Sequence, residues 1–335
     1  MQENDIVLDV KDLAIEFHVD NEVIKAVNHI SFKVRQGKTL GLVGETGAGK
    51  TTTAKAIMRL TPIPPGVIRS GDIHVCGRDV LHMDKRELGK FRGKEISMIF
   101  QDPMTALNPV LTVGEQIAES IRLHEHLNNH EAQKRAGEML EIVGIPANRA
   151  NDYPHQFSGG MKQRVVIALA LACNPKLLIA DEPTTALDVT IQAQVLELMR
   201  KIRDEYQMAM IMITHDLGIV AEICDEVAVM YAGHIVEHGT LEDVFLRTKH
   251  PYTEGLFNSL PDISNRSEPL KPIPGMMPNP ADLPAGCAFA PRCAYATEKC
   301  RAGIPPEIAF SDTHFALCSA YEDPGFCLKG KKKDE

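Results

Sequence analysis

Short runs of apolar residues alternate along the chain with longer segments in which apolar residues recur at helical spacing. The runs at residues 39–43 (TLGLV) and 177–180 (LLIA) have the length and composition of strands. The segments TVGEQIAESIRLHEH (112–126) and HEAQKRAGEMLEIVG (130–144) have the spacing of helices. Strands and helices that alternate in this way predict an α/β fold.

Length and proline distribution suggest how the chain is divided. A chain of 335 residues is longer than one compact core usually requires, so we expect two units. Beyond residue 260 prolines become frequent, at positions 261, 269, 272, 274, 278, 280, 284 and 291. We predict a large domain over residues 1–260, with a small β-rich N-terminal portion and a helical subdomain at roughly 102–165, and a C-terminal extension over 261–335.

Composition and charge exclude several classes of protein. With 44% hydrophobic and 24% charged residues, the chain has an ordinary globular composition. Its formal net charge of -9 argues against nucleic acid as a partner. No run approaches 18 apolar residues, and the N-terminus MQENDIVLDVKDL lacks the basic and apolar regions of a signal peptide. We therefore expect a cytoplasmic location, where cysteines stay reduced.

The strongest local signal is a glycine-rich loop between a predicted strand and a predicted helix. Residues 44–51, GETGAGKT, fit the pattern G-x-x-x-x-G-K-S/T, in which backbone N–H groups converge on phosphate oxygens. Lys50 would reach the terminal phosphates and Thr51 a Mg²⁺ ion. In this context an ordinary glycine turn is a poor alternative. The predicted nucleotide-binding residues here are Gly44, Glu45, Thr46, Gly47, Ala48, Gly49, Lys50, Thr51 and Thr52.

Two further strands end in polar side chains suited to phosphate chemistry. The run LLIA leads directly into Asp181 and Glu182, where Asp181 would hold Mg²⁺ through water and Glu182 would polarise the attacking water. A strand leaving the core is the alternative, but Lys50 favours the nucleotide site. The run MAMIMITHD ends at His215, which would contact the γ-phosphate unless it is structural.

A second phosphate-binding helix start is predicted at FSGGM. Ser158 can cap this helix, and Gly159 and Gly160 expose its first N–H groups. One chain rarely brings two such helix ends to the same phosphate, so this helix would meet ATP held by another subunit. A capped amphipathic helix without ligand is the alternative.

Taken together, these motifs resemble those of the ATP-binding subunits of ABC transporters over residues 8–260. The chain has GETGAGKT as the Walker A loop, IFQDP as the Q-loop, FSGGM as the signature, LLIADEP as Walker B, TALD as the D-loop and ITHD as the switch, in family order. The resemblance implies ATP and Mg²⁺ as cofactors, Gln101 as a catalytic and Mg²⁺-binding residue, and Asp188 at the nucleotide. Phe17 would stack on adenine, a core phenylalanine being the alternative.

The signature departs from the family pattern LSGGQ at two positions. Met161 replaces the glutamine and Phe157 the leucine, so the contact across the dimer is expected to persist without the glutamine side chain. Glu182 and His215 are both present, which argues against a non-catalytic regulatory ATP binder. The resemblance therefore implies an ATPase that is competent in hydrolysis.

The kind of ABC protein follows from the helical segments and from what the chain lacks. In the family the helical subdomain meets the membrane subunits, and a chain without a membrane span must act on separate membrane partners. A soluble ABC ATPase acting on DNA or the ribosome is the rival class. Such proteins usually carry two cassettes or a long coiled-coil insertion, and neither is visible here.

Finer features resemble the peptide and nickel importer ATPases, the dipeptide and oligopeptide branch especially. These are QDPMTALNP, YPHQFSGGMKQR, DEPTTALDVTIQAQ and KHPYTEGLFNSLP. The resemblance implies import of di- or oligopeptides, with nickel as the rival substrate. It also implies two membrane permease subunits, a second and paralogous ATPase subunit, an extracytoplasmic substrate-binding protein that acts indirectly, and a peripheral location at the cytoplasmic face of the membrane.

Four cysteines near the C-terminus predict a metal centre. Cys287, Cys293, Cys300 and Cys318 follow the pattern C-x5-C-x6-C-x17-C, and four thiolates suit either a structural zinc or an iron–sulfur cluster. The spacing does not choose between these ligands or free thiols. The string GCAFAPRCAYATEKC resembles the C-terminal element of peptide-importer ATPases, which implies a 4Fe-4S cluster. His314 and Cys327 would be spare ligands or, alternatively, unrelated residues.

Overall fold

The computed structural model describes residues 5–185, 187–259 and 272–328. Its strands are β1 (Ile6–Val19), β2 (Glu22–Arg35), β3 (Thr39–Val43), β4 (Gly66–Val75), β5 (Arg78–Asp79), β6 (Ile96–Ile99), β7 (Leu177–Asp181), β8 (Ala209–Thr214), β9 (Glu226–Tyr231), β10 (His234–Thr240), β11 (Glu307–Ala309) and β12 (Phe315–Leu317). Its α-helices are α1 (Lys50–Ile57), α2 (Lys85–Phe91), α3 (Pro103–Ala106), α4 (Val113–Glu125), α5 (Asn129–Ile142), α6 (Gly159–Leu171), α7 (Val189–Tyr206), α8 (Leu217–Ile223), α9 (Leu241–Leu246), α10 (Pro251–Asn258) and α11 (Glu298–Ala302). Short 3-10 turns are η2 (Ala147–Asn151), η3 (Pro154–Gln156) and η4 (Ser319–Glu322).

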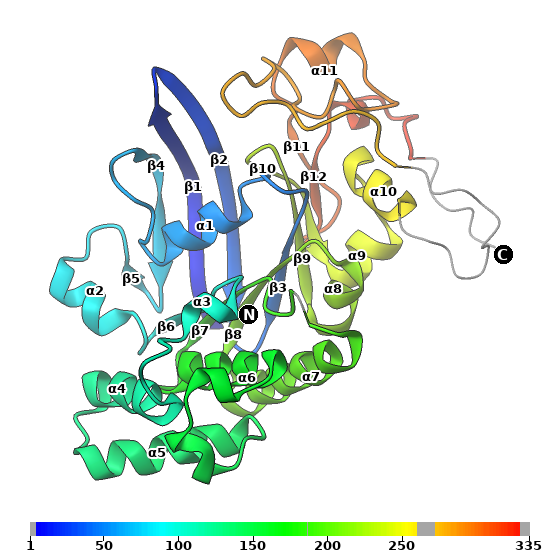
Figure 1. Ribbon diagram of the computed structural model, residues 1–335. Helices are drawn as coiled ribbons and strands as arrows, with labels where there is room; N and C mark the ends of the chain where they lie inside the picture. The colour runs from blue at the N-terminus through cyan, green and yellow to red at the C-terminus, as the bar shows by residue number, and fades with distance from the viewer. Residues whose placement is uncertain (1–4, 186, 260–271, 329–335) are drawn as a thin grey trace.

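The larger of the two sheets places the functional loops at one edge. Its strand order is β11-β12-β10-β9-β3-β8-β7-β6, and β9, β3, β8, β7 and β6 run parallel (Figure 1). The strands predicted at 39–43 and 177–180 are confirmed as β3 and β7, with β7 continuing to Asp181. Because the carboxyl ends of parallel strands share an edge, Gly44, Glu182 and His215 emerge together.

The predicted β-rich N-terminal portion is confirmed as a separate antiparallel sheet, in the order β2-β1-β4-β5. Buried side chains of this sheet, such as Leu13 and Ile30, share one hydrophobic core with Leu40 and Leu42 of β3. The antiparallel sheet is thus fixed against the strand that leads into the phosphate loop.

The helices predicted from residues 112–126 and 130–144 are confirmed as α4 and α5. Each begins at a capping side chain: Thr112 accepts the N–H of Glu115, and Asn128 forms a capping box with Glu131. Both helices contact α6, and they lie at the opposite end of the molecule from the orange and red C-terminal segment in Figure 1. Within the described residues no helix is both long and apolar enough to span a bilayer.

The segment over residues 272–328 packs against the large domain more closely than its proline-rich sequence suggests. Strand β12 pairs with β10, and β11 pairs with β12, so this segment extends the larger sheet. Phe289 is buried in the main core. These two strands were not expected from the sequence, because strands of three residues each are too short to be seen as a pattern. The expected boundary between residues 260 and 261 lies outside the described residues.

Candidate functional site

The glycine-rich loop connects β3 to α1 and needs glycine at two close backbone contacts. Gly44 has φ +148°, and a Cβ atom there would lie 2.1 Å from the carbonyl oxygen of Met230. Gly49 has φ +107°, and its Cβ would lie 2.5 Å from the carbonyl oxygen of Ala26. Any larger side chain would displace the loop, so these glycines hold its backbone in place.

Lys50 is the first residue of α1, and its charged end lies inside the loop. The side chain is 7% exposed, and Nζ donates to the carbonyl oxygens of Gly44 at 2.7 Å and Glu45 at 3.0 Å. Burial lowers the pKa of Lys50, while the carboxylates of Glu182 and Asp181 oppose that shift. This largely buried ammonium group is suited to anionic phosphate oxygens.

Thr51 and Asp181 lie together where a phosphate-bound cation would need ligands. The Thr51 hydroxyl donates to Asp181 Oδ1 at 3.3 Å, and Asp181 is buried. Burial raises the pKa of Asp181, and the Thr51 hydrogen bond only partly offsets this. Magnesium typically takes one or two carboxylates together with waters and substrate phosphates, so this hydroxyl and carboxylate fit the ion.

Glu182 is held by three side chains from three different segments. Its carboxylate accepts from Gln101 Nε2 at 2.9 Å and from Thr185 Oγ1 at 3.1 Å, and it lies 3.0 Å from His215 Nδ1. Burial raises the pKa of Glu182, but the hydrogen bonds from His215 and Thr185 outweigh it, so the net pKa is lowered. Glu182 is therefore ionised at neutral pH, as a base must be.

The backbone of Glu182 is also unusual. Its φ is +48°, in the left-handed region that a glutamate rarely adopts, and its N–H donates to the carbonyl oxygen of Ile213 on β8. Backbone strain of this kind is concentrated at functional sites, where the surrounding structure fixes it. The structure thus brings together Lys50, Thr51, Gln101, Asp181, Glu182 and His215, all predicted from the sequence.

The signature residues lie at the start of α6, as predicted, but among the hydrogen bonds of the described residues none joins them to the phosphate loop. Ser158 Oγ accepts the N–H of Met161, which begins the helix. A Cβ atom on Gly160 would lie 2.6 Å from Ile191 of α7, the helix that Asp188 caps. The signature and the residues after Walker B are therefore neighbours on one surface.

Phe17 lies in β1, partly exposed, where it pairs with Ile24 of β2. Ile24 is two residues from Ala26, whose carbonyl oxygen lies too close to Gly49 for a Cβ atom there. The Phe17 side chain also packs against the hydrophobic core that the antiparallel sheet shares with β3, so its role at adenine stays a prediction.

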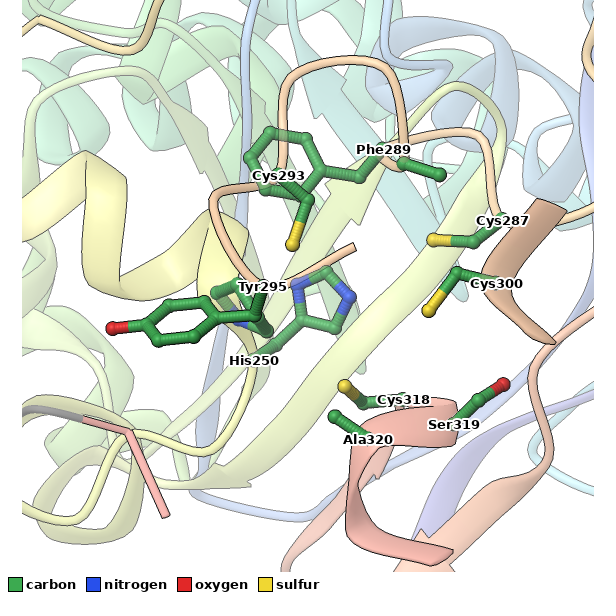
Figure 2. A pocket seen from close by; sticks show the side chains of 11 residues that line it. His250, Cys287, Phe289, Cys293, Tyr295, Cys300, Cys318, Ser319 and Ala320 are labelled. Atoms are coloured by element: carbon green, nitrogen blue, oxygen red, sulfur yellow. The ribbon is translucent and has the colours of Figure 1, made fainter. Parts of the chain in front are cut away.

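The four C-terminal cysteines line one pocket, together with His250, Phe289 and Tyr295 (Figure 2). Their sulfur atoms face the space between them in Figure 2. Three of these sulfur atoms accept hydrogen bonds from backbone N–H groups two or three residues further along the chain. Cys287 accepts from Phe289 and Ala290, Cys293 accepts from Tyr295, and Cys318 accepts from Ala320. Burial, with smaller contributions from neighbouring thiols, raises the pKa of Cys293 to about 12 and of Cys318 to about 11.

The described residues contain no group of three or more His, Cys, Asp or Glu side chains arranged to hold a metal ion. This arrangement of the described side chains therefore supports neither the predicted iron–sulfur cluster nor a shared zinc ion. His314 is not at the pocket, since its Nε2 lies 3.0 Å from Glu237 Oε1 in the adjoining sheet. Cys327 is exposed.

The fold and the converging site define a class of ATP-binding protein, and comparisons with known proteins agree. Residues 27–185 match the family model described as ABC transporter, and the chain is an ABC-type ATPase with mixed α/β sheets. The dimeric post-hydrolysis structure of the ATP-binding cassette MJ0796 with ADP and Pi has a TM-score of 0.63 and 27% identity, covering 70% of this chain and 98% of that one.

The branch follows from the C-terminal region and from close relatives. Residues 236–300 match the model described as oligopeptide/dipeptide transporter, C-terminal region. The chain is 52% identical over 311 residues to the oligopeptide transport ATP-binding protein OppD of Bacillus subtilis, covering 92% of this chain and 87% of the relative. It is 49% identical over 319 residues to OppD of Escherichia coli, covering 95% and 94%. The chain therefore belongs to the family of ATP-binding proteins of peptide ABC transporters.

Two residues at the phosphate loop and one beside Glu182 were not predicted from the sequence. Tyr252 lies in the string KHPYTEGLFNSLP but was given no role there, and its hydroxyl accepts the N–H of Glu45 at 2.9 Å. Arg292, between two of the cysteines, binds the Glu45 carboxylate through Nη1 at 3.0 and 3.1 Å. Thr185 supports Glu182, and its place just after Walker B was the one available hint.

Proposed function

We propose that this chain hydrolyses ATP to power the import of di- or oligopeptides through separate membrane permease subunits. The observation that carries the proposal is the convergence of Lys50, Thr51, Asp181 and Glu182 at one sheet edge, in a chain whose relatives are named as peptide transporters. Within this proposal residues 1–260 form the ATP-binding domain, with a helical subdomain at roughly 102–165, and residues 261–335 form the extension.

The side chains have separable roles in hydrolysis. Lys50 would bind the terminal phosphates, while Thr51, Asp181 and Gln101 would hold Mg²⁺, which neutralises phosphate charge. Glu182 would accept a proton from the attacking water, and His215, 67% exposed at the entrance, would contact the γ-phosphate. The hydrogen bonds to Glu182 orient its carboxylate before substrate arrives.

A second ATPase subunit would complete the site. Ser158, Gly159 and Gly160 present helix N–H groups, and Asp188 is exposed beside them, so this surface suits an ATP molecule bound to another subunit. MJ0796, a related cassette, has been solved as a dimer. We propose a paralogous partner subunit, with the substrate-binding protein acting only through the permeases.

The permeases would contact the helical end of the molecule. Val110, just before α4, is 74% exposed, and Leu123 within α4 is 69% exposed, so both apolar side chains are accessible for such a contact. Binding there would hold the chain peripherally at the cytoplasmic face of the membrane.

Uptake in cells tests the transport proposal. Cells lacking this chain are expected to lose uptake of a labelled tripeptide, and wild-type protein should restore it while Glu182→Gln should not, because closure without hydrolysis cannot reset the transporter. Labelled nickel is measured in parallel. Loss of nickel uptake alone would favour the nickel importer, and unchanged uptake of both would indicate an ABC ATPase outside transport.

We further propose that the four-cysteine pocket holds a 4Fe-4S cluster, which would crosslink a segment that has few core residues. Support comes from the four thiols that line one pocket and from the N–H groups directed at three of the sulfurs, since hydrogen bonds of this kind stabilise thiolates and adjust cluster potential. In a cluster each thiolate binds a different iron, so the sulfurs need not converge on one point as they must around zinc.

Anaerobic purification followed by an absorption spectrum and by iron, sulfide and zinc analysis tests the cluster. Iron and sulfide in equal amounts are expected in the wild type, with both lost on Cys293→Ser. Cys327→Ser is the matched control, because this exposed thiol lies in the same segment outside the pocket and should leave the metal content unchanged. Zinc in place of iron, or no metal in the wild type, would contradict the cluster.

A further inference from the structure

Arg292 links the cysteine-bearing segment to the phosphate loop. Its Nη1 lies 3.0 Å and 3.1 Å from the two carboxylate oxygens of Glu45, the second residue of that loop, and 3.3 Å from the hydroxyl of Tyr231. Its Nε donates to the carbonyl oxygen of Pro274 at 2.8 Å. The Arg292 side chain is only 7% exposed, so the guanidinium group is fixed by partners on several sides.

Glu45 is held at each of its polar groups. Its N–H donates to Tyr252, its carbonyl oxygen accepts from Lys50, and its carboxylate binds Arg292. The Glu45 side chain is 31% exposed. A carboxylate at this place lies among backbone groups that would bind ATP phosphates, and its charge would repel them unless a cation offsets it.

Aromatic packing gives the contact a rigid support. Phe289, two residues beyond Cys287, packs edge-on against Tyr231 and Tyr252 at ring-centroid distances of 5.2 and 5.4 Å. Tyr231 and Tyr252 also contact each other at 4.6 Å. The segment that carries the cysteines is thus seated on the same two tyrosines that reach Arg292 and Glu45, so the guanidinium position depends on that segment.

We infer that Arg292 is a positioning residue of the ATP site, which neutralises Glu45 and fixes the phosphate loop for binding nucleotide. This inference rests on the proposed nucleotide site at residues 44–51. Through Arg292 the C-terminal segment contributes directly to ATP affinity, although the residue itself need not touch the nucleotide.

The size of the effect follows from the charge left behind. Removing one member of a partly buried ion pair leaves the other charge uncompensated. With Glu45 uncompensated beside the phosphates, Arg292→Gln is expected to weaken ATP binding about tenfold. KM for ATP should rise by a similar factor while kcat changes by less than about twofold, because Glu182 and its partners are untouched.

Four variants and one control test the inference. The variants are Arg292→Gln, Arg292→Lys, Glu45→Gln and the double variant of Arg292→Gln with Glu45→Gln. Each is measured by titration with a fluorescent ATP analogue and by steady-state kinetics. Arg292→Lys keeps the charge and should recover most of the affinity. The double variant Arg292→Gln with Glu45→Gln removes both charges and should bind ATP within about threefold of the wild type. Lys299→Gln, which breaks the exposed Lys299–Glu322 pair of the same segment, is the control and should bind like the wild type.

The outcomes separate this inference from the proposed function. A purely structural role for Arg292 would leave the double variant as weak as Arg292→Gln, and that result would overturn the inference. Normal affinity in Arg292→Gln would overturn it as well. If Arg292→Gln does not fold, Glu45→Gln alone decides: affinity should be equal or tighter, and weaker binding rejects charge neutralisation. Failure of the wild type to bind ATP would instead overturn the proposed function, and the inference with it.

Discussion

Replacing Glu182 with glutamine is expected to lower the ATPase turnover number about 10³-fold while ATP binding stays within about threefold of the wild type. Glutamine keeps the shape of the side chain and can still pair with Gln101 and Thr185, but it cannot accept a proton from water. Single-turnover hydrolysis measured at saturating MgATP, together with equilibrium binding of ATP, separates the chemical step from affinity.

Glu222→Gln provides a matched control for this prediction. Glu222 is an exposed glutamate near the end of α8, the helix that begins just after His215, and its neutralisation should leave turnover unchanged. If Glu182→Gln retained more than about a tenth of wild-type turnover, another group would have to be the base.

Lys50→Met is expected to weaken ATP binding about 100-fold or more. Methionine replaces the buried aliphatic stem of Lys50 but removes its ammonium group. Among the described side chains of the loop, only this group supplies a full positive charge to the terminal phosphates. The two loop carbonyl oxygens that Nζ binds would also lose their donor. Equilibrium dialysis with labelled ATP and Mg²⁺ measures the loss.

The control for Lys50→Met is Lys55→Met, in the same helix. Lys55 is exposed in the last turn of α1, and its electrostatic influence on Asp181 is a minor one, so ATP affinity should be nearly unchanged. An equal loss of ATP affinity in both variants would mean that the overall charge, and not a contact between Lys50 and the phosphates, causes the effect. Unchanged ATP binding in Lys50→Met would mean that the nucleotide binds elsewhere.

Much of the site could be predicted from the sequence because its residues follow directly after buried strands. Asp181, Glu182 and His215 each lie within a residue or two of the end of β7 or β8, and parallel strands bring such ends together. The loop at residues 44–51 has its own spacing signal. Helices α4 and α5 were predicted to within two residues because they are long enough for periodicity to be evident.

Other features have no local signal. Arg292 and Glu45 are separated by 247 positions, and nothing around a single arginine indicates which carboxylate it will meet. The strands β11 and β12 are too short for a period to be recognised. The contact proposed for Ser158 requires a second subunit, so neither the sequence nor one folded chain can place its ligand. For the cysteines, the thiols could be grouped by sequence, but their spacing does not determine which metal they bind.

The pairing of β12 with β10 has a consequence for how the molecule is protected in the cell. Without β12, the backbone N–H and C=O groups along one side of β10 would form an open sheet edge, which is a template for aggregation. The strand that covers this edge is synthesised some 75 residues later, from Phe315 onward. A ribosome-bound chain that has completed every ATP-site motif therefore still carries an unpaired edge, and its protection from self-association waits until β12 has been synthesised.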